Sequence, residues 1–429
     1  MRTEFSIEQL QNAGLAEMES ILRKCVHCGF CNATCPTYRL TGDELDGPRG
    51  RIYLMKDMLE HGSKPVSEVV RHIDRCLSCL SCTSTCPSGV DYMHLVDHSR
   101  AYIEKRYTRS LFDRFYRALL ANVLPSPDRF RTLIRLAKLL SWCRPLLPST
   151  VSASIKLAVN SQISTGQAHA GSVFKTNKQK RGTVALLQGC AQQVIGKHIN
   201  DATIRILNRS GFDVHILNEN ECCAAIEHHL GKEQRALERI KTNLKSWASQ
   251  LPQFDALISN ASGCGTMLKD YGHLLKSDPE YSSLASLVSG KTKDICEFLH
   301  ENESLVFSTP RNNKITYQNP CSMQHGQRLS KQPLSLLEQA GYKIESLPDS
   351  HICCGSAGTY NILQSDLAEK LGQQKTQQLE STGADIIASG NLGCMTQLQQ
   401  YSGLPLVHTI ELLDWASSGP TPMALNKNF

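Results

Sequence analysis

The 429-residue sequence lacks any long apolar run. No stretch reaches the roughly 18 consecutive apolar residues of a membrane-spanning helix, and the first nine residues show no apolar signal-peptide core. The excess of positive over negative charge is also small: the chain has 46 Lys and Arg against 40 Asp and Glu, and no lysine-rich tail. Nucleic acid is therefore not an expected partner. We expect a cytoplasmic chain with no transmembrane segment, whose only membrane contact is peripheral, on the inner face.

Several cofactor and catalytic motifs are also missing. No G-x-G-x-x-G follows an expected strand and opens a helix, so no dinucleotide-binding fold is expected. No flavin-binding domain, P-loop or Ser/His/Asp arrangement is recognisable. Removal of a hydride from an organic substrate needs a two-electron acceptor. We therefore expect no flavin and no catalytic residue in this chain.

Cysteine, in contrast, is abundant, with 18 in the chain. Eight of them form two runs of the pattern C-x2-C-x2-C-x3-C-P, which is the bacterial pattern for [4Fe–4S] clusters. In this pattern the fourth cysteine, followed by proline, ligates the other cluster. A zinc site or a disulfide framework would not need the third cysteine at the same step. The spacing predicts two [4Fe–4S] clusters, one held by Cys25, Cys28, Cys31 and Cys86 and the other by Cys76, Cys79, Cys82 and Cys35.

Residues 1–108 are expected to form an α-helical ferredoxin domain around these clusters. Ser6 and Gln9 have the spacing of a capping box and open an expected helix that runs through Leu22. The two cysteine runs are separated by 40 residues, more than a minimal bacterial ferredoxin needs. Further helices are expected in this insertion at 51–59 and 66–73.

Two arginines precede the first of these helices. Arg49 and Arg51 lie in a Gly-Pro-Arg-Gly-Arg stretch. They either offset the negative charge of the thiolate-bound clusters and raise their reduction potentials, or belong to a solvated basic helix start.

Residues 109–181 have a different composition. Apolar residues recur at helical spacing, with arginine and lysine interleaved, through about residue 145. Such basic amphipathic helices lie on anionic membranes, dock on partners or pack on their own protein. The basic residues of the second helix are Arg131, Arg135 and Lys138. The segment that ends at Arg181 is rich in Ser, Gln, Lys and Gly and is expected to be a linker.

The C-terminal half contains two copies of one pattern, at 182–305 and 306–429. In each copy a single cysteine is followed after 32 residues by an adjacent pair, and the last cysteine lies 41 or 40 residues beyond the pair. Short β-rich runs alternate with helical stretches, which predicts a parallel α/β sheet in each copy. The expected strands are 183–188, 212–217 and 256–259 in the first copy and 314–318, 342–347 and 386–389 in the second.

Each copy places its four cysteines at the carboxyl ends of these strands, where ligands of parallel sheets gather. The two quartets are Cys190, Cys222, Cys223 and Cys264, and Cys321, Cys353, Cys354 and Cys394. Each could hold a further cluster or a zinc ion, act as a redox-active thiol pair, or consist of buried small hydrophobes. The last role is expected for Cys143 and Cys296. His325 and His351 are candidates for ligating or tuning a site.

Taken together, two C-x2-C-x2-C-x3-C-P loops and two Cys…Cys-Cys-Gly…Cys repeats resemble the iron–sulfur subunit of bacterial glycolate oxidase over nearly the whole chain. Related architectures are the iron–sulfur subunits of anaerobic glycerol-3-phosphate dehydrogenase, lactate-utilisation proteins and heterodisulfide reductase. The last of these ends each repeat in C-x2-C, whereas this chain has Met267 and Gln397 at the fifth-cysteine positions, and Ala224 replaces the expected glycine of the first repeat.

The resemblance implies an α-helical ferredoxin domain followed by a duplicated α/β domain with two parallel-sheet cysteine-rich repeats. It implies an electron-transfer subunit that receives electrons from FAD-binding flavoprotein subunits converting glycolate to glyoxylate, and passes them toward a membrane quinone or another acceptor. Two alternatives remain: the same role in a lactate or glycerol-3-phosphate dehydrogenase, and a thiol–disulfide or quinone reductase that uses the cysteine repeats.

Overall fold

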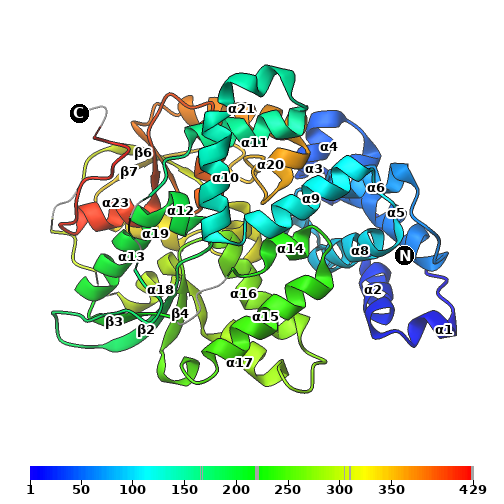
Figure 1. The fold of residues 1–429 in the computed structure, drawn as a ribbon, viewed down its shortest axis with the longest axis horizontal. Coiled ribbons are helices and arrows are strands. Elements are labelled where there is room, and N and C mark those ends of the chain that lie inside the picture. Colours follow the sequence, from blue (N-terminus) through cyan, green and yellow to red (C-terminus); the bar gives the residue numbers. More distant parts are fainter. Residues whose placement is uncertain (165, 167, 218–221, 304, 309–310, 427–429) are drawn as a thin grey trace.

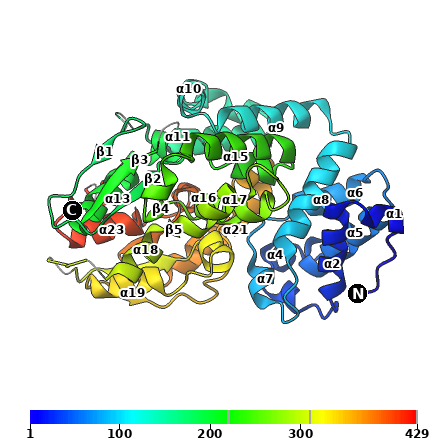
Figure 2. The same cartoon turned by 90° about the horizontal axis from the view of Figure 1, so that it is seen from below.

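The computed structural model describes residues 1–164, 166, 168–217, 222–303, 305–308 and 311–426 (Figure 1). A helical N-terminal domain lies to one side of two α/β units, and α9 and α10 lie along one face of the molecule (Figure 2). No helix in the described ranges has both the length and the apolar character required to cross a membrane.

The N-terminal domain is entirely helical, as expected for residues 1–108. The expected first helix is instead two helices, because Asn12 interrupts it and caps the second by accepting a hydrogen bond from the Leu15 amide. The capping box of Ser6 and Gln9 forms as predicted. The elements are α1 Ile7–Leu10, α2 Ala13–Lys24, α3 Phe30–Ala33, α4 Pro36–Thr41, η1 Glu44–Asp46, α5 Pro48–Glu60, α6 Ser67–Asp74, α7 Ser81–Thr85 and α8 Tyr92–Arg106.

The segment after this domain forms three α-helices and a 3-10 helix: α9 Leu111–Val123, α10 Pro127–Leu139, η2 Ser141–Leu146 and α11 Ser149–Asn160. The start of α9 is anchored by Asp74, which accepts hydrogen bonds from Arg109 and Arg117. The expected linker also contributes structure, because the strand β1 Val173–Phe174 pairs antiparallel with β3.

The first repeat contains a sheet of order β1-β3-β2-β4-β5, parallel except for β1. The expected strands form within one or two residues of their expected ends, and β5 is additional. The elements are β2 Gly182–Leu187, α12 Gln192–Ile195, α13 Lys197–Arg209, β3 Phe212–Ile216, α14 Ala225–His229, α15 Glu233–Trp247, η3 Leu251–Gln253, β4 Ala256–Ser259, α16 Ser262–Leu274, α17 Ser282–Lys291, β5 Thr292–Asp294 and α18 Ile295–Asn302.

The second repeat has a fully parallel sheet of order β7-β6-β8-β9, which matches β3-β2-β4-β5 of the first. The duplicated parallel α/β fold is therefore confirmed. The elements are β6 Lys314–Gln318, η4 Ser322–Gly326, α19 Gln332–Gln339, β7 Lys343–Glu345, α20 Tyr360–Leu363, α21 Ser365–Glu380, β8 Ile386–Ser389, α22 Leu392–Leu398, β9 Leu406–His408 and α23 Thr409–Ala416.

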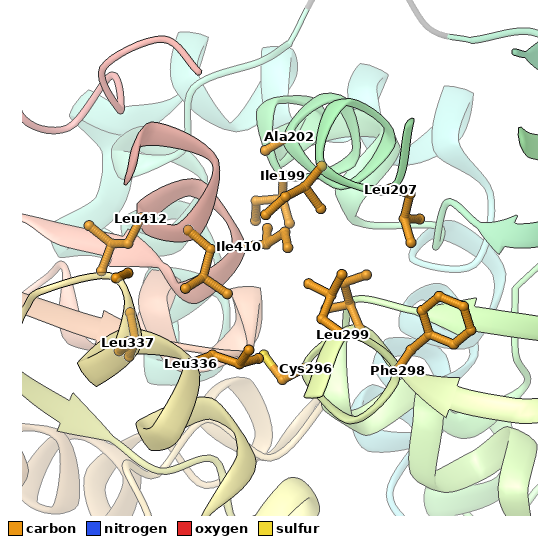
Figure 3. Close-up of a cluster of buried hydrophobic side chains, with 14 of the residues drawn as sticks. Ile199, Ala202, Leu207, Cys296, Phe298, Leu299, Leu336, Leu337, Ile410 and Leu412 are labelled. Carbon is orange, nitrogen blue, oxygen red and sulfur yellow. The ribbon is translucent and has the colours of Figure 1, made fainter. Parts of the chain in front are cut away.

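The two repeats share one hydrophobic core (Figure 3). Ile199 of α13 and Ile410 of α23 lie close together in it, as do Cys296 of α18 and Leu336 of α19. The helix contacts are reciprocal: α13 of the first repeat packs on α23, the last helix of the second, and α19 of the second repeat packs on α18, the last helix of the first. Asp414 of α23 adds an ion pair at 2.6 Å to Arg205 of α13.

Candidate metal centres

The two ferredoxin-type loops have the same backbone conformation. In each, the chain leaves a helix just before the first cysteine and enters a short helix, α3 or α7, just before the third. Residues two and four positions after the first cysteine have left-handed φ values: His27 (58°) and Gly29 (82°), and Ser78 (49°) and Leu80 (62°). This conformation costs a non-glycine residue about 1 kcal/mol or more and is concentrated at functional sites.

The first pocket is lined by Cys25, Cys28, Cys31 and Cys86, and Cys82 also borders it. Its other walls are partly apolar, with Ile52 and Val90. Burial, followed by the neighbouring thiolates of Cys25, Cys86 and Cys28, raises the pKa of Cys31 to about 11. Cys28 is exposed, so this pocket reaches the surface.

The second pocket is lined by Cys35, Cys76, Cys79 and Cys82. All four are buried, and burial raises the pKa of Cys79 and of Cys82 well above the usual range. The second pocket takes three cysteines from one loop and Cys35 from the other, whereas the first takes three from one loop and both Cys82 and Cys86 from the other. The members of each predicted group of four therefore line a common pocket, and Cys82 borders both pockets.

This donor set fits iron–sulfur clusters. Burial raises the pKa of Cys25 and Cys31 in the first pocket and of Cys79 and Cys82 in the second. These thiols would keep their protons in the absence of a cation, because several thiolates in an apolar pocket repel one another. A cluster iron displaces those protons and supplies the compensating charge. The eight cysteines would be its ligands, four in each pocket.

Arg51 is the buried cation of the second pocket. Its side chain is 1% exposed, and Nη1 lies 3.9 Å from the sulfur of Cys35, while Nε donates to the His72 carbonyl at 2.7 Å. Although burial opposes its charge, the thiol of Cys76 and other neighbours keep the pKa of Arg51 above its ordinary value. Arg49 is different, because it lies at the surface and pairs with Glu44 at 2.6 Å.

The quartet of the first repeat converges at the carboxyl end of its sheet. The sulfurs of Cys190 and Cys222 are 3.5 Å apart, and Cys223 contacts both Cys222 and Cys264. The thiol contact with Cys222, followed by burial, raises the pKa of Cys190 well above its usual value. Ala224, directly after the pair, has a left-handed φ of 71°.

The quartet of the second repeat converges in the same way. The sulfurs of Cys321 and Cys353 are 3.8 Å apart, and Cys354 contacts Cys353 and Cys394. Gly355, which follows the pair, has a φ of 84° and packs tightly: a Cβ there would lie 2.7 Å from the Ala368 carbonyl oxygen. This contact explains the glycine better than its φ alone, since the first repeat accepts alanine at the same place.

The second quartet lies directly beside the second pocket. Cys79 packs with Cys353 in one hydrophobic cluster, with Cys321 at its edge, and the charge of Cys321 contributes to the raised pKa of Cys79. The first quartet is held to the N-terminal domain through a different contact, in which Asp97 of α8 pairs with His228 at 3.3 Å.

The remaining candidates are separate from the thiol clusters or at their edges. Cys296 lies in the shared core, as expected, whereas Cys143 is only partly buried on η2. His325 Nδ1 is 2.8 Å from the Ser84 hydroxyl of α7, and burial lowers the pKa of His325 to about 4. His351 is partly buried near it.

Sequence reasoning missed Lys375. This buried side chain lies near Cys354 and Cys353, and burial lowers its pKa to about 8. Its Nζ donates to the Ser350 carbonyl at 3.1 Å. At the same distance from its cysteine pair, the first repeat has Leu244. A lysine in one copy where the other has a leucine was the signal in the sequence that could have identified Lys375.

Comparison with known proteins follows the same division. Residues 21–90 match the model of the 4Fe-4S dicluster domain, and residues 184–269 and 315–399 each match the model of the Cysteine-rich domain. The chain is 39% identical to the glycolate oxidase iron–sulfur subunit of Escherichia coli K12, across 97% of this chain and 99% of that protein. The chain belongs to the glycolate oxidase iron–sulfur subunit family. The matched domains indicate that members of this family carry iron–sulfur clusters.

Three further proteins are similar to this chain. A probable glycolate oxidase iron–sulfur subunit of Bacillus subtilis 168 is 33% identical over 93% of both chains. Lactate utilization protein A of Anoxybacillus flavithermus is 26% identical and matches 54% of this chain and 98% of its own length. A hypothetical protein from Helicobacter pylori, 11% identical, superposes with a TM-score of 0.57 over 97% of this chain and 74% of that one, which shows a shared fold.

Proposed function

We propose that this chain is the electron-transfer subunit of a glycolate oxidase complex. A flavoprotein partner with FAD would oxidise glycolate to glyoxylate, since hydride removal needs a two-electron acceptor and clusters accept single electrons. The observation that carries the proposal is the pair of cysteine-lined pockets, each built from both loops. Cys25, Cys28, Cys31 and Cys86 would hold one [4Fe–4S] cluster, and Cys35, Cys76, Cys79 and Cys82 the other.

The substrate assignment is supported by similarity over the full length. The two glycolate oxidase relatives align along nearly all of this chain, whereas the lactate protein aligns with about half of it. Whichever the substrate is, the flavoprotein would bind it. The substrates are therefore distinguished by measuring turnover of the assembled complex with glycolate, lactate and glycerol 3-phosphate in turn.

The two thiol quartets are proposed as further metal sites. Four converging thiols can bind either an additional cluster or a zinc ion. Direct thiol–disulfide chemistry is less compatible with them, because Cys222, Cys223, Cys353 and Cys354 are each no more than 3% exposed, and a disulfide substrate must reach the attacking sulfur.

A peripheral membrane contact is proposed for the surface formed by residues 109–146, here called the basic surface. Residues 109–146 contain eight of the 46 Lys and Arg but only two of the 40 Asp and Glu. Arg109 and Arg117 are buried against Asp74, so the other six cations are the ones available at this surface. Large apolar residues are exposed on it, among them Phe115, Leu139, Trp142 and Leu146. Exposed aromatic and aliphatic side chains among cations favour an anionic bilayer surface. A membrane quinone would then be within reach as the acceptor.

Iron and acid-labile sulfide in the anaerobically purified chain, with EPR of the reduced form, test the central proposal. Two clusters require about eight of each per chain and two interacting paramagnetic centres. Fewer than eight irons in a fully folded, oxygen-protected preparation would refute the two-cluster assignment. Iron beyond eight, or stoichiometric zinc, would show that the quartets are occupied as well.

A further inference from the structure

A polar cavity of about 270 Å³ lies between α11 and the helices α20, α21 and α22 of the second repeat. Asn361 and Gln397 line it and are more than nine-tenths buried. Arg144, Lys156 and Tyr401 line it as well, with the carboxylates of Asp366 and Glu369. A cavity of this size with a few converging polar groups is suited to a small polar ligand or to the polar ring of a larger one.

The cavity adjoins the second thiol quartet. Gln397 lies three residues after Cys394 on α22, and its Nε2 donates to the Ala368 carbonyl at 3.0 Å. The same carbonyl oxygen packs against Gly355, the residue that follows Cys353 and Cys354. One layer of protein therefore separates the cavity from the quartet, and the quartet lies against Cys79 of the second pocket.

The first repeat shows that the fold does not require these polar residues. At the same distances from its own cysteines it has Leu230 in place of Asn361 and Met267 in place of Gln397. Both are buried. The two copies thus share one scaffold, and only the second has a buried amide pair at this position, where Asn361 Nδ2 donates to Gln397 Oε1 at 3.1 Å.

An apolar surface adjoins the polar cavity. The 3-10 helix η2 contributes Arg144 to the cavity wall and also carries Trp142, 76% exposed, and Leu146, 85% exposed. Leu139 at the end of α10 is 71% exposed. A ligand that filled the cavity with a polar head could lay an apolar tail along these side chains, on the basic surface.

We propose that this cavity binds the ring of a lipid-soluble quinone, the acceptor of the electrons. The proposal rests on the function proposed above and locates its acceptor site. The reaction is the reduction of the quinone by two electrons and two protons to a quinol. The electrons are those removed from the hydroxy acid by the flavoprotein, and the protons come from water at the cavity, where Asp366 and Glu369 lie.

Photolabelling of the full-length, anaerobically purified chain with an azido-substituted short-tail benzoquinone locates the site directly. We expect label in peptides that contain residues 142–157, 360–369 or 397–401, and we expect excess unlabelled quinone to suppress it. Label confined to other peptides, or label in these peptides that excess quinone does not suppress, would overturn the proposal. This measurement needs neither a variant nor turnover.

The double variant Asn361→Leu with Gln397→Met tests the recognition, because it gives the second repeat the residues that the first already has at these positions. We expect the Kd of the quinone, measured by calorimetry, to rise about tenfold or more, which is about 1.4 kcal/mol. Gln399→Met, an exposed position at the end of the same helix, is the matched control and should leave the Kd unchanged.

The assembled complex separates this inference from the function on which it rests. With glycolate as donor, the double variant should reduce ferricyanide, a water-soluble acceptor, at the native rate but show a raised KM for quinone. Native KM and Kd for quinone in that variant would refute the cavity assignment alone. A native complex that reduces neither acceptor with glycolate would refute the proposed function itself.

Discussion

Replacement of Arg51 by methionine should lower the reduction potential of one cluster and leave the other unchanged. The guanidinium is buried against the second pocket, 3.9 Å from the Cys35 sulfur, whereas Arg49 near the first pocket is at the surface and neutralised by Glu44. At that distance two unit charges in an effective dielectric of about 20 interact by about 4 kcal/mol. An added electron is shared by the whole cluster and lies farther away, so about half of this, or on the order of 100 mV for one electron, is the expected shift.

Arg51→Lys is the control that separates charge from structure. Lysine keeps the positive charge but cannot reproduce the hydrogen bonds of Arg51 to His72 and Thr37. Both variants should lose about 2–4 kcal/mol of stability, because the buried His72 carbonyl and Thr37 hydroxyl lose their hydrogen bonds from Arg51. Only the methionine variant should show the large potential shift.

The assay is an EPR-monitored redox titration of the reduced, anaerobic chain, with iron content measured on the same samples. If both signals shift equally in Arg51→Met, or if neither shifts while eight irons remain bound, the electrostatic reasoning is wrong. A shift of equal size in Arg51→Lys would instead assign the effect to altered packing around Cys35.

Three further outcomes are expected. Cys86→Ser should remove about half of the iron, since the cluster proposed for the first pocket loses one of its four ligands, whereas Cys143→Ser should remove none; equal losses would contradict the ligand assignment. Burial lowers the pKa of His94, but Asp270 and Asp91 raise it more, to about 10; because this folded pKa exceeds the unfolded value of about 6.5, the stabilisation of a few kcal/mol is complete below pH 6.5 and lost as pH rises through 10. Urea unfolding should therefore show native stability falling between these pH values and His94→Gln falling less; parallel curves would exclude His94 as the cause. Trp142→Ser with Leu146→Ser should weaken binding to anionic vesicles about tenfold or more, because two exposed apolar side chains are removed, while Ile7→Ser, equally exposed on α1, should not; unchanged sedimentation with vesicles would remove the basic surface as the contact.

Local spacing predicted most of the secondary structure around the cysteines. The strands 256–259, 314–318 and 386–389 form at the expected residues. They were predictable because each is a short β-rich run that precedes a Gly-Cys or Pro-Cys pair, a pattern that depends on local sequence alone. The grouping of Cys86 with the first loop was likewise readable, since proline after the fourth cysteine turns the chain away.

Features that depend on distant contacts were not predictable. The strand Val173–Phe174 has a composition typical of a linker and forms because β3 offers it an open edge. The apposition of Cys79 and Cys353 joins residues 274 positions apart, and no local pattern encodes it. The break at Asn12 was missed for another reason: the apolar spacing continues across it, while the asparagine cap stops the first helix.

The reciprocal packing of α13 on α23 and of α18 on α19 has an implication for how the duplicated half could be assembled. Exchange of equivalent surfaces in both directions is the arrangement of a two-fold symmetric dimer. One repeat cut from the chain would present a broad apolar face with nothing to cover it, and the only complementary partner available would be another copy of itself. The halves are thus expected to unfold together, in a single cooperative transition, although each has its own sheet.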